Sequence, residues 1–213
     1  MKLHLVRKGM PLMHEQGAPC DSSDSSLSQV VNGHEARIRQ AREGDESAFA
    51  ALVRDLYAPL CTYLARLVGN DELGQDLAQE TLIRAWTSLP ELREEQYFKA
   101  WLYRIATNLA RSQLRRARLI RWLSWTQTEK EASSALHIQG PEERVSEADL
   151  LQTVLARLSP QYRTCLLLQV IAGFSQCEIA HLLGISEKSV GSNVCRGREQ
   201  FRRLYASLKG DPE

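Results

Sequence analysis

Apolar residues recur at three- and four-residue spacings along most of this chain, which is the period of amphipathic helices. We find neither the two-residue alternation that is typical of strands nor a hairpin turn. The sequence therefore predicts an all-α fold. Capping residues and glycines divide the periodic part into helices expected over residues 36–43, 46–67, 72–89, 97–119, 147–158, 161–172, 176–183 and from 187 onward.

The last two of these helices predict a helix-turn-helix. Ser175 and Glu178 stand at the spacing of a capping box, and Gly184 suits a left-handed C-terminal cap. Ile185 is expected to fill the space between the helices, and Ser186 to cap the second one. That second helix then presents polar side chains near its start, as recognition of the DNA major groove requires: Lys188, Ser189, Ser192, Asn193, Arg196 and Arg198.

The helices group into two small domains joined by a flexible linker. Residues 33–119 form the first domain, and residues 146–209 form the second, which ends in the helix-turn-helix. Residues 120–145 are predicted to be the linker, because they contain the segment WLSW, weak periodicity and a Gly-Pro break. Residues 1–32 are polar and serine-rich, which predicts a disordered leader.

Charge is balanced in total but not in distribution. The chain has 27 Lys and Arg against 26 Asp and Glu. Acidic residues crowd the stretch 71–95, whereas residues 99–121 contain seven basic residues and no acidic one. The near-neutral total therefore conceals an acidic surface and a basic one, and the basic one is suited to phosphate groups.

Several classes of function lack support in the sequence. Five cysteines are scattered without a CxxC motif, so we expect reduced thiols and a cytoplasmic protein. Five dispersed histidines predict no metal site, and no apolar run is long enough to predict membrane insertion. Phosphate-binding glycine loops and the common hydrolase motifs are missing, so we expect neither a cofactor nor enzymatic activity.

Five segments, in order and at matching spacing, resemble the extracytoplasmic-function sigma factors of bacterial RNA polymerase. They are GDESAFAALV (44–53), DLAQETLIRAW (76–86), FKAWLYRIATNLARSQLRR (98–116), LSPQYRTCLLL (158–168) and FSQCEIAHLLGIS (174–186). The resemblance implies a first domain that binds core RNA polymerase and opens the minus-ten promoter element. It implies a second domain that binds the minus-thirty-five element as duplex DNA, and it implies control by an anti-sigma factor in response to stress or another signal.

The same resemblance assigns roles to individual residues. It implies that the polymerase-binding residues are Asp76, Leu77, Gln79, Glu80, Arg84 and Trp86, of which Trp86 also suits a core position. It implies that the DNA-binding residues are Lys99, Arg104, Asn108, Arg111, Arg115 and Arg116 in the first domain, and Ser186, Lys188, Ser189, Ser192, Asn193, Arg196 and Arg198 in the second. Capture of unstacked bases is implied for the loop 91–96 and for the face that carries Asn108, Arg111 and Arg115.

Two other functions compete with this interpretation. A stand-alone helix-turn-helix regulator predicts a surface for self-association and a palindromic site, and the sequence indicates neither. A helical adaptor that does not bind DNA leaves the basic stretch 99–121 unexplained. The sequence also departs from the family in the recognition helix, where Gly191 and Gly197 each cost about 1 kcal/mol of helix stability relative to Ala. We therefore expect a weaker or different preference for the upstream element, unless these glycines end the helix early.

Overall fold

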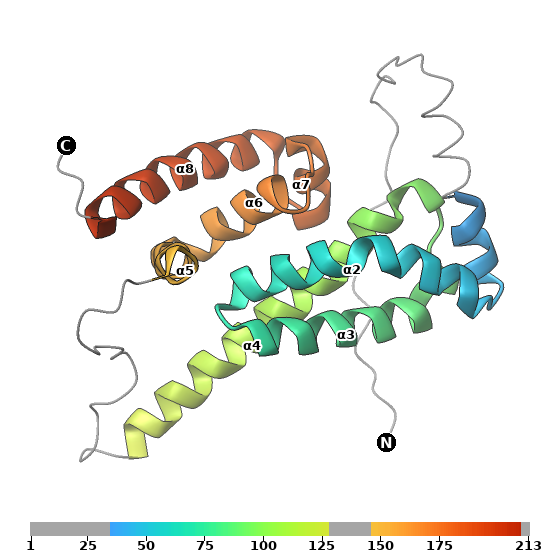
Figure 1. Ribbon diagram of the computed structural model, residues 1–213, viewed down its shortest axis with the longest axis horizontal. Coiled ribbons are helices and arrows are strands. Elements are labelled where there is room, and N and C mark those ends of the chain that lie inside the picture. Colours follow the sequence, from blue (N-terminus) through green and yellow to red (C-terminus); the bar gives the residue numbers. More distant parts are fainter. Residues whose placement is uncertain (1–34, 128–145, 210–213) are drawn as a thin grey trace.

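The computed structural model describes residues 35–127 and 146–209, and every regular element in these two ranges is helical (Figure 1). This confirms the all-α fold class. The predicted leader and most of the predicted linker lie outside the described residues. A helix over residues 35–42 begins the first domain, which continues with α2 (Glu46–Val68), α3 (Asp71–Ser88), the short η1 (Leu89–Glu91) and η2 (Glu95–Tyr97), and α4 (Phe98–Gln127). The second domain contains α5 (Glu147–Arg157), α6 (Pro160–Val170), α7 (Gln176–Leu183) and α8 (Glu187–Lys209).

Local capping chemistry explains where the helices of the first domain begin and end. The Asp45 side chain accepts hydrogen bonds from the backbone amides of Ser47 and Ala48, as an N-cap does. α2 runs through Pro59 and ends at Gly69, whose φ of 84° is in the left-handed region that favours glycine. Asn70 then caps α3 through the amide of Leu73, so a two-residue turn reverses the chain.

α2 and α3 approach each other closely because small residues face each other where they cross. A Cβ atom added at Gly74 would lie 2.6 Å from the backbone N and Cα of Ala65. Ala78 and Ala85, on the same side of α3, are fully buried. This line of small side chains decides which face of α3 meets the core and which meets solvent.

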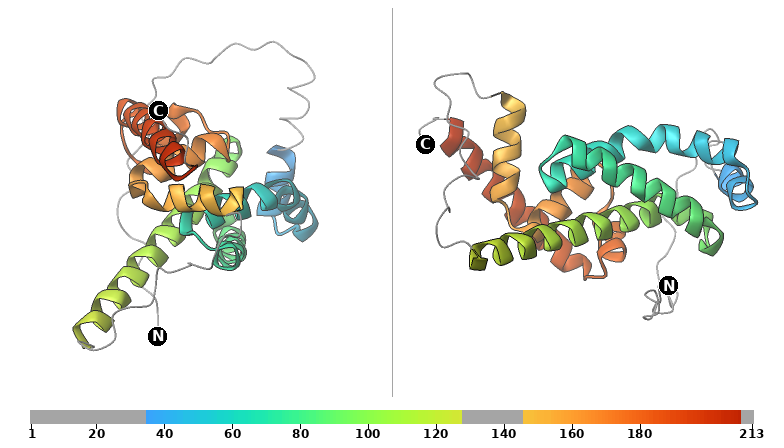
Figure 2. Two further views of the ribbon diagram at one scale, coloured as in Figure 1. Left: turned by 60° about the vertical axis from the view of Figure 1, so that its left-hand side comes forward. Right: turned by 90° about the horizontal axis from the view of Figure 1, so that it is seen from below.

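α4 is the longest element and continues beyond the predicted start of the linker. Its first half is packed in the core through Phe98, Leu102 and Ala106. Its second half extends past the rest of the domain in both views of Figure 2. The helix was expected to end near Leu119, but it continues to Gln127, so the backbone of the WLSW segment is helical.

The second domain follows its predicted caps. Ser146 caps α5, and Ser159 caps α6 with Pro160 in its first turn, where the missing amide hydrogen costs nothing. α8 continues through both of its glycines to Lys209, so the glycines do not end it early. Gly197 is explained by packing, because a Cβ atom there would lie 3.2 Å from the Cβ of Tyr162 on α6.

The two domains are packed against each other and share one apolar cluster. The ring of Tyr103 on α4 meets the ring of Phe174 edge to face at 5.2 Å between centroids. The ammonium group of Lys99 donates to the backbone carbonyl of Ala172 at 2.7 Å and lies 4.9 Å from the centre of the Phe174 ring. A guanidinium nitrogen of Arg163 donates to the carbonyl of Leu67 at 3.2 Å. The structure is therefore a closed arrangement of the two domains.

Candidate protein and nucleic-acid interfaces

The outer face of α3 carries the acidic and amide residues that the sequence singled out. Asp76, Gln79 and Glu80 are exposed, and their spacing places them on adjacent turns of one face. Arg84 donates to Glu80 one turn away, so this carboxylate is partly compensated. The face combines negative charge with amide hydrogen-bonding groups, which suits a basic protein surface.

Two apolar residues on α3, Leu77 and Ile83, lie differently from what the sequence suggested, whereas Trp86 takes the core position that it also suits. Leu77, a predicted polymerase contact, is only 4% exposed and belongs to the core beneath the acidic face. Trp86 is half-buried and packs on Phe49 with ring centroids 5.0 Å apart. The helical period of residues 72–89 predicts a buried Ile83 as well, but this side chain is 66% exposed beside Gln79 and Glu80. The sequence missed Ile83 because the small residues of α3 occupy the buried side that an isoleucine would otherwise take.

The loop between α3 and α4 is held at two points. Leu92 is buried, and a guanidinium nitrogen of Arg42 lies 3.1 Å from a carboxylate oxygen of Glu95. The side chain of Arg93 between these anchors and that of Gln96 directly after them are exposed, and Tyr97 at the loop's end is 45% exposed. Tyr97 therefore differs from Phe98 and Tyr103, which are buried, and it is the aromatic residue near this loop with a ring available to stack on a base.

The polar face of α4 places four of the six DNA-binding residues predicted in the first domain in one stripe. Arg104, Asn108, Arg111 and Arg115 follow each other at intervals of four, three and four residues, which keeps them on one side of the helix. Arg104, Asn108 and Arg115 are exposed and Arg111 is half-buried, while Arg116 is exposed next to the stripe. Lys99 does not belong to this free surface, because its ammonium group contacts Ala172 and Phe174 of the second domain.

The helix-turn-helix forms as the local chemistry predicts. Both halves of the Ser175–Glu178 capping box are present, and Gly184 has a φ of 67°. The Ser186 side chain accepts a hydrogen bond from the amide of Ser189 at 3.2 Å, which starts α8. Ile185 is more exposed than predicted, since it is 38% exposed and lines the cavity between the two domains that is described below.

The polar residues of α8 divide between two environments. Lys188, Ser192 and Arg196 are exposed and lie one turn apart on a single stripe. Asn193 is half-buried on another side of the helix, where its amide nitrogen lies 3.8 Å from the sulfur of Cys165. Arg198, although exposed, donates to the side chain of Gln169 at 3.0 Å. Cys165 and Gln169 both belong to α6 of the same domain, so the stripe of α8 without such partners is the one that carries Lys188, Ser192 and Arg196.

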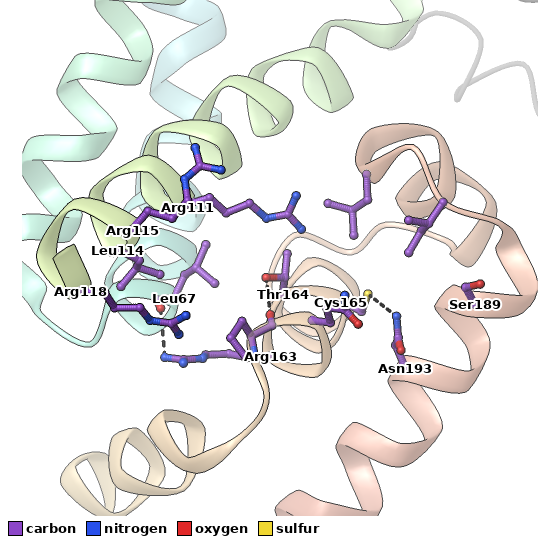
Figure 3. A pocket seen from close by; sticks show the side chains of 14 residues that line it. Leu67, Arg111, Leu114, Arg115, Arg118, Arg163, Thr164, Cys165, Ser189 and Asn193 are labelled. Atoms are coloured by element: carbon purple, nitrogen blue, oxygen red, sulfur yellow. Dashed lines mark hydrogen bonds between the residues drawn. The ribbon is translucent and has the colours of Figure 1, made fainter. Parts of the chain in front are cut away.

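A cavity of about 600 Å³ lies between the two domains (Figure 3). Arg111, Arg115 and Arg118 enter its wall from α4, and Arg163 enters from α6. Ser189 and Asn193 approach it from α8 on the opposite side. Burial and the nearby charge of Arg118 lower the pKa of the Arg163 guanidinium. Residues from both candidate DNA-binding surfaces thus meet at one cavity.

The described residues also bear on metal sites and membrane spans. Within residues 35–127 and 146–209 we find no group of three or more His, Cys, Asp or Glu residues that could hold a metal ion. In the same ranges no helix is both long enough and apolar enough to cross a membrane. Cys61, Cys165, Cys177 and Cys195 are free thiols.

Comparison with known proteins finds two family models in this chain. The model of sigma-70 region 2 matches residues 52–120, and the model of sigma-70 region 4 matches residues 148–201. The chain is 34% identical over 181 residues to the ECF RNA polymerase sigma factor SigW of Bacillus subtilis, a match that covers 81% of this chain and 96% of SigW. It is 31% identical over 182 residues to the RNA polymerase sigma factor CnrH of Cupriavidus metallidurans, covering 82% and 93% of the two chains.

Two solved structures are also similar. The structure of CnrH in complex with the cytosolic domain of CnrY matches with a TM-score of 0.60 and 27% identity, over 84% of this chain and 99% of that one. The structure of the sigma factor RpoE of Bartonella quintana in complex with the anti-sigma factor NepR matches with a TM-score of 0.61 and 26% identity, over 77% and 98% of the two chains.

Proposed function

This chain belongs to the extracytoplasmic-function sigma factors of bacterial RNA polymerase, and we propose how its two domains divide the work of that family. The protein is not an enzyme. It binds core RNA polymerase and directs transcription initiation at specific promoters. Membership rests on matches in both domains, which neither a stand-alone helix-turn-helix regulator nor a helical adaptor would give.

The outer face of α3 is our proposed contact with core polymerase. Asp76, Gln79, Glu80 and Arg84 supply its polar groups, and the exposed Ile83 supplies an apolar contact at its centre. Leu77 and Trp86 act from beneath by packing α3 against the rest of the domain. A charged face around one exposed apolar side chain resembles the polar rim and apolar centre of other protein interfaces.

The loop 91–96, Tyr97 and the stripe on α4 are our proposed site for the minus-ten element. Opening the duplex requires neutralisation of phosphates and a surface for unstacked bases. Arg104, Arg111, Arg115 and Arg116 supply the charge, Asn108 supplies hydrogen bonds, and Tyr97 supplies a ring. Stacking of one base on an aromatic ring contributes about 1 to 3 kcal/mol.

α8 is our proposed recognition helix for the minus-thirty-five element. Lys188, Ser192 and Arg196 form the stripe that is exposed in the closed arrangement, and Ser186 and Ser189 flank its N-terminus. We assign Asn193 to a base edge and Arg196 to a phosphate. Asn193→Ala should then change the preferred upstream base, whereas Arg196→Ala should weaken all sequences alike and lower the salt slope by about one unit. Selection of binding sites from a randomised upstream element tests both roles, and an unchanged preferred sequence with Asn193→Ala would contradict the assignment.

The closed arrangement must open for this function. The names of the minus-ten and minus-thirty-five elements place them about 25 base pairs apart, which is about 85 Å of B-DNA at 3.4 Å per pair. Domains that share contacts such as Tyr103 with Phe174 cannot span that distance. The two domains therefore separate when the protein engages a promoter, and the segment between α4 and α5 provides the connection.

Control by an anti-sigma factor follows from the similar structures, in which CnrH is bound to CnrY and RpoE to NepR. We propose an anti-sigma partner for this chain as well, and a response to stress or another signal. Because its polymerase and DNA partners are cytoplasmic, we place the protein in the cytoplasm.

The observation that carries this proposal is the presence, in one chain, of an exposed acidic face on α3 and a helix-turn-helix matched to sigma-70 region 4. The direct test is transcription with purified core polymerase on fragmented genomic DNA, followed by sequencing of transcript 5′ ends. Defined start sites should require both the chain and the core enzyme. Start sites that are the same with core enzyme alone would contradict the function.

A further inference from the structure

The cavity between the two domains is lined by positively charged side chains and by no negatively charged one. Arg111, Arg115 and Arg118 line it from the first domain, and Arg163 lines it from the second. No acidic residue is among its lining residues. Arginine stays charged at any physiological pH, so the cavity carries four positive charges.

These four arginines find little compensation within the described ranges. The ion pairs there involve other arginines, namely Arg39, Arg42, Arg84 and Arg203. Arg163 donates one hydrogen bond, to the carbonyl of Leu67, and its Nε is buried without a partner. A guanidinium group has five donor hydrogens, so Arg163 retains unused capacity. An uncompensated, partly buried charge is unfavourable unless an anion joins it.

The closed arrangement is what gathers the charge. Arg163 reaches α4 only because the second domain packs on the first through Tyr103, Phe174 and Lys99. Tyr103, whose ring makes this contact between the domains, has a buried hydroxyl without a hydrogen-bond partner. Apolar contacts between the domains therefore stabilise the closed state, and unsatisfied polar groups destabilise it. A ligand that neutralises the arginines shifts this balance toward closure.

We propose that this cavity binds a small polyphosphate anion, either inorganic or as a nucleoside polyphosphate, and that binding holds the two domains closed. Arginine is well matched to phosphate oxygens because its fork donates two parallel hydrogen bonds. A volume of about 600 Å³ is in the range of small-molecule sites and excludes duplex DNA. A single sulfate or phosphate carries too little charge to satisfy guanidinium groups on both domains.

The regulatory consequence rests on the function proposed above. Arg111, Arg115 and Asn193 are assigned to DNA and also line the cavity. Since the ligand occupies them and favours closure, polyphosphate and promoter DNA bind in competition. The closed state thus binds polyphosphate, and the open state binds promoter DNA.

Calorimetric titration of the full chain with sodium tripolyphosphate is the first test. We expect one site per chain in the wild type and about tenfold weaker binding, or none, in Arg118→Gln and in Arg163→Gln. Arg54→Gln is the matched control, because Arg54 is an exposed arginine on α2 that does not line the cavity. Its affinity should stay within about twofold of the wild type, as expected for a charge whose interactions are screened.

Further arms identify the chemistry of the ligand. Equal binding of ATP and tripolyphosphate assigns recognition to the phosphates alone, whereas tighter binding of ATP assigns part of it to the nucleoside. Adenosine and sodium sulfate at matched ionic strength should not bind measurably. Equal affinities in the wild type, Arg118→Gln and Arg163→Gln, or an equal response to sulfate, would overturn the proposed site.

The second test separates this inference from the proposed function. Tripolyphosphate is added to the chain before or after core polymerase and promoter DNA, with free Mg²⁺ held constant. We expect fewer transcripts only when it is added first, and we expect Arg118→Gln to lose this dependence on order. Normal transcription without any effect of order contradicts the closing role alone, whereas no promoter-specific transcription without tripolyphosphate contradicts the proposed function itself.

Discussion

Replacing Gly74 by alanine tests how closely α2 and α3 are packed beneath the proposed polymerase-binding face. The new Cβ would lie 2.6 Å from the N and Cα of Ala65 and 2.8 Å from its Cβ. Carbon atoms in favourable contact are about 3.5 to 4.0 Å apart, so the added Cβ would be about 1 Å too close to Ala65. The atoms in the way belong mainly to the backbone of α2, which cannot rotate aside as a side chain end can. The two helices must therefore separate.

The sign of the effect follows from two opposing contributions. Alanine gains about 1 kcal/mol over glycine inside a helix. Overpacking of a well-packed core costs typically about 1 to 3 kcal/mol, and a backbone clash belongs at the upper end of that range. Gly74→Ala should therefore lower the free energy of unfolding by about 2 kcal/mol. For a first domain of this size, about 2 kcal/mol corresponds to a melting temperature lower by about 8 to 16 °C.

Gly191→Ala is the matched control on α8, the proposed recognition helix. Its Cβ would lie 2.9 Å from the side-chain oxygen of Gln176, which can turn away. This variant should keep most of the gain in helix propensity, so its free energy of unfolding should be higher than that of the wild type by up to about 1 kcal/mol. Circular dichroism during heating and in urea measures both variants. A Gly74→Ala protein as stable as the wild type, or both variants shifted in the same direction, would refute the close packing of α2 on α3.

Three further outcomes are expected. Reversal of charge at Asp76 and Glu80 should abolish binding to core polymerase in a pull-down while the helical circular dichroism spectrum is kept, and full binding would remove this face from the interface. Replacement of Arg115 and Arg116 by alanine should leave core binding intact but reduce promoter melting and the salt dependence of DNA binding. Unchanged permanganate reactivity of thymines would show that these two arginines do not take part in melting. Burial raises the pKa of Tyr103 from 10.0 to about 12, so the unfolded chain loses this proton first and stability should fall as the pH rises from about 10 to about 12. Urea unfolding at the two ends of this range should show a smaller loss in Tyr103→Phe, which removes a hydroxyl that has no partner, and the same loss in both proteins would count against this cause.

The sequence by itself determined the features that depend on a few neighbouring residues. The boundaries of α7 were predicted to the residue, because Ser175, Glu178 and Gly184 act through hydrogen bonds and φ angles within one turn. The starts of α2 and α6 follow from Asp45 and Ser159 in the same way. The acidic stretch, the basic stretch and the helix-turn-helix were likewise visible, since side-chain type and helical period place them on faces.

Tertiary structure decided which of several possible faces is buried. Periodicity alone does not distinguish Ile83 from Leu77, and only the close approach of α2 at Gly74 exposes the first and buries the second. Similarly, Lys99 has the sequence context of a DNA contact, but the second domain provides it with a carbonyl partner.

The interdomain cavity has no signal in the sequence. Arg163 and Arg118 are 45 positions apart, on helices of different domains, and their proximity depends on how the domains pack. Hydrogen bonds and backbone angles act within a turn of helix, so they are encoded locally. Packing and electrostatics act between surfaces that are brought together only on folding, and they decide what those local elements do.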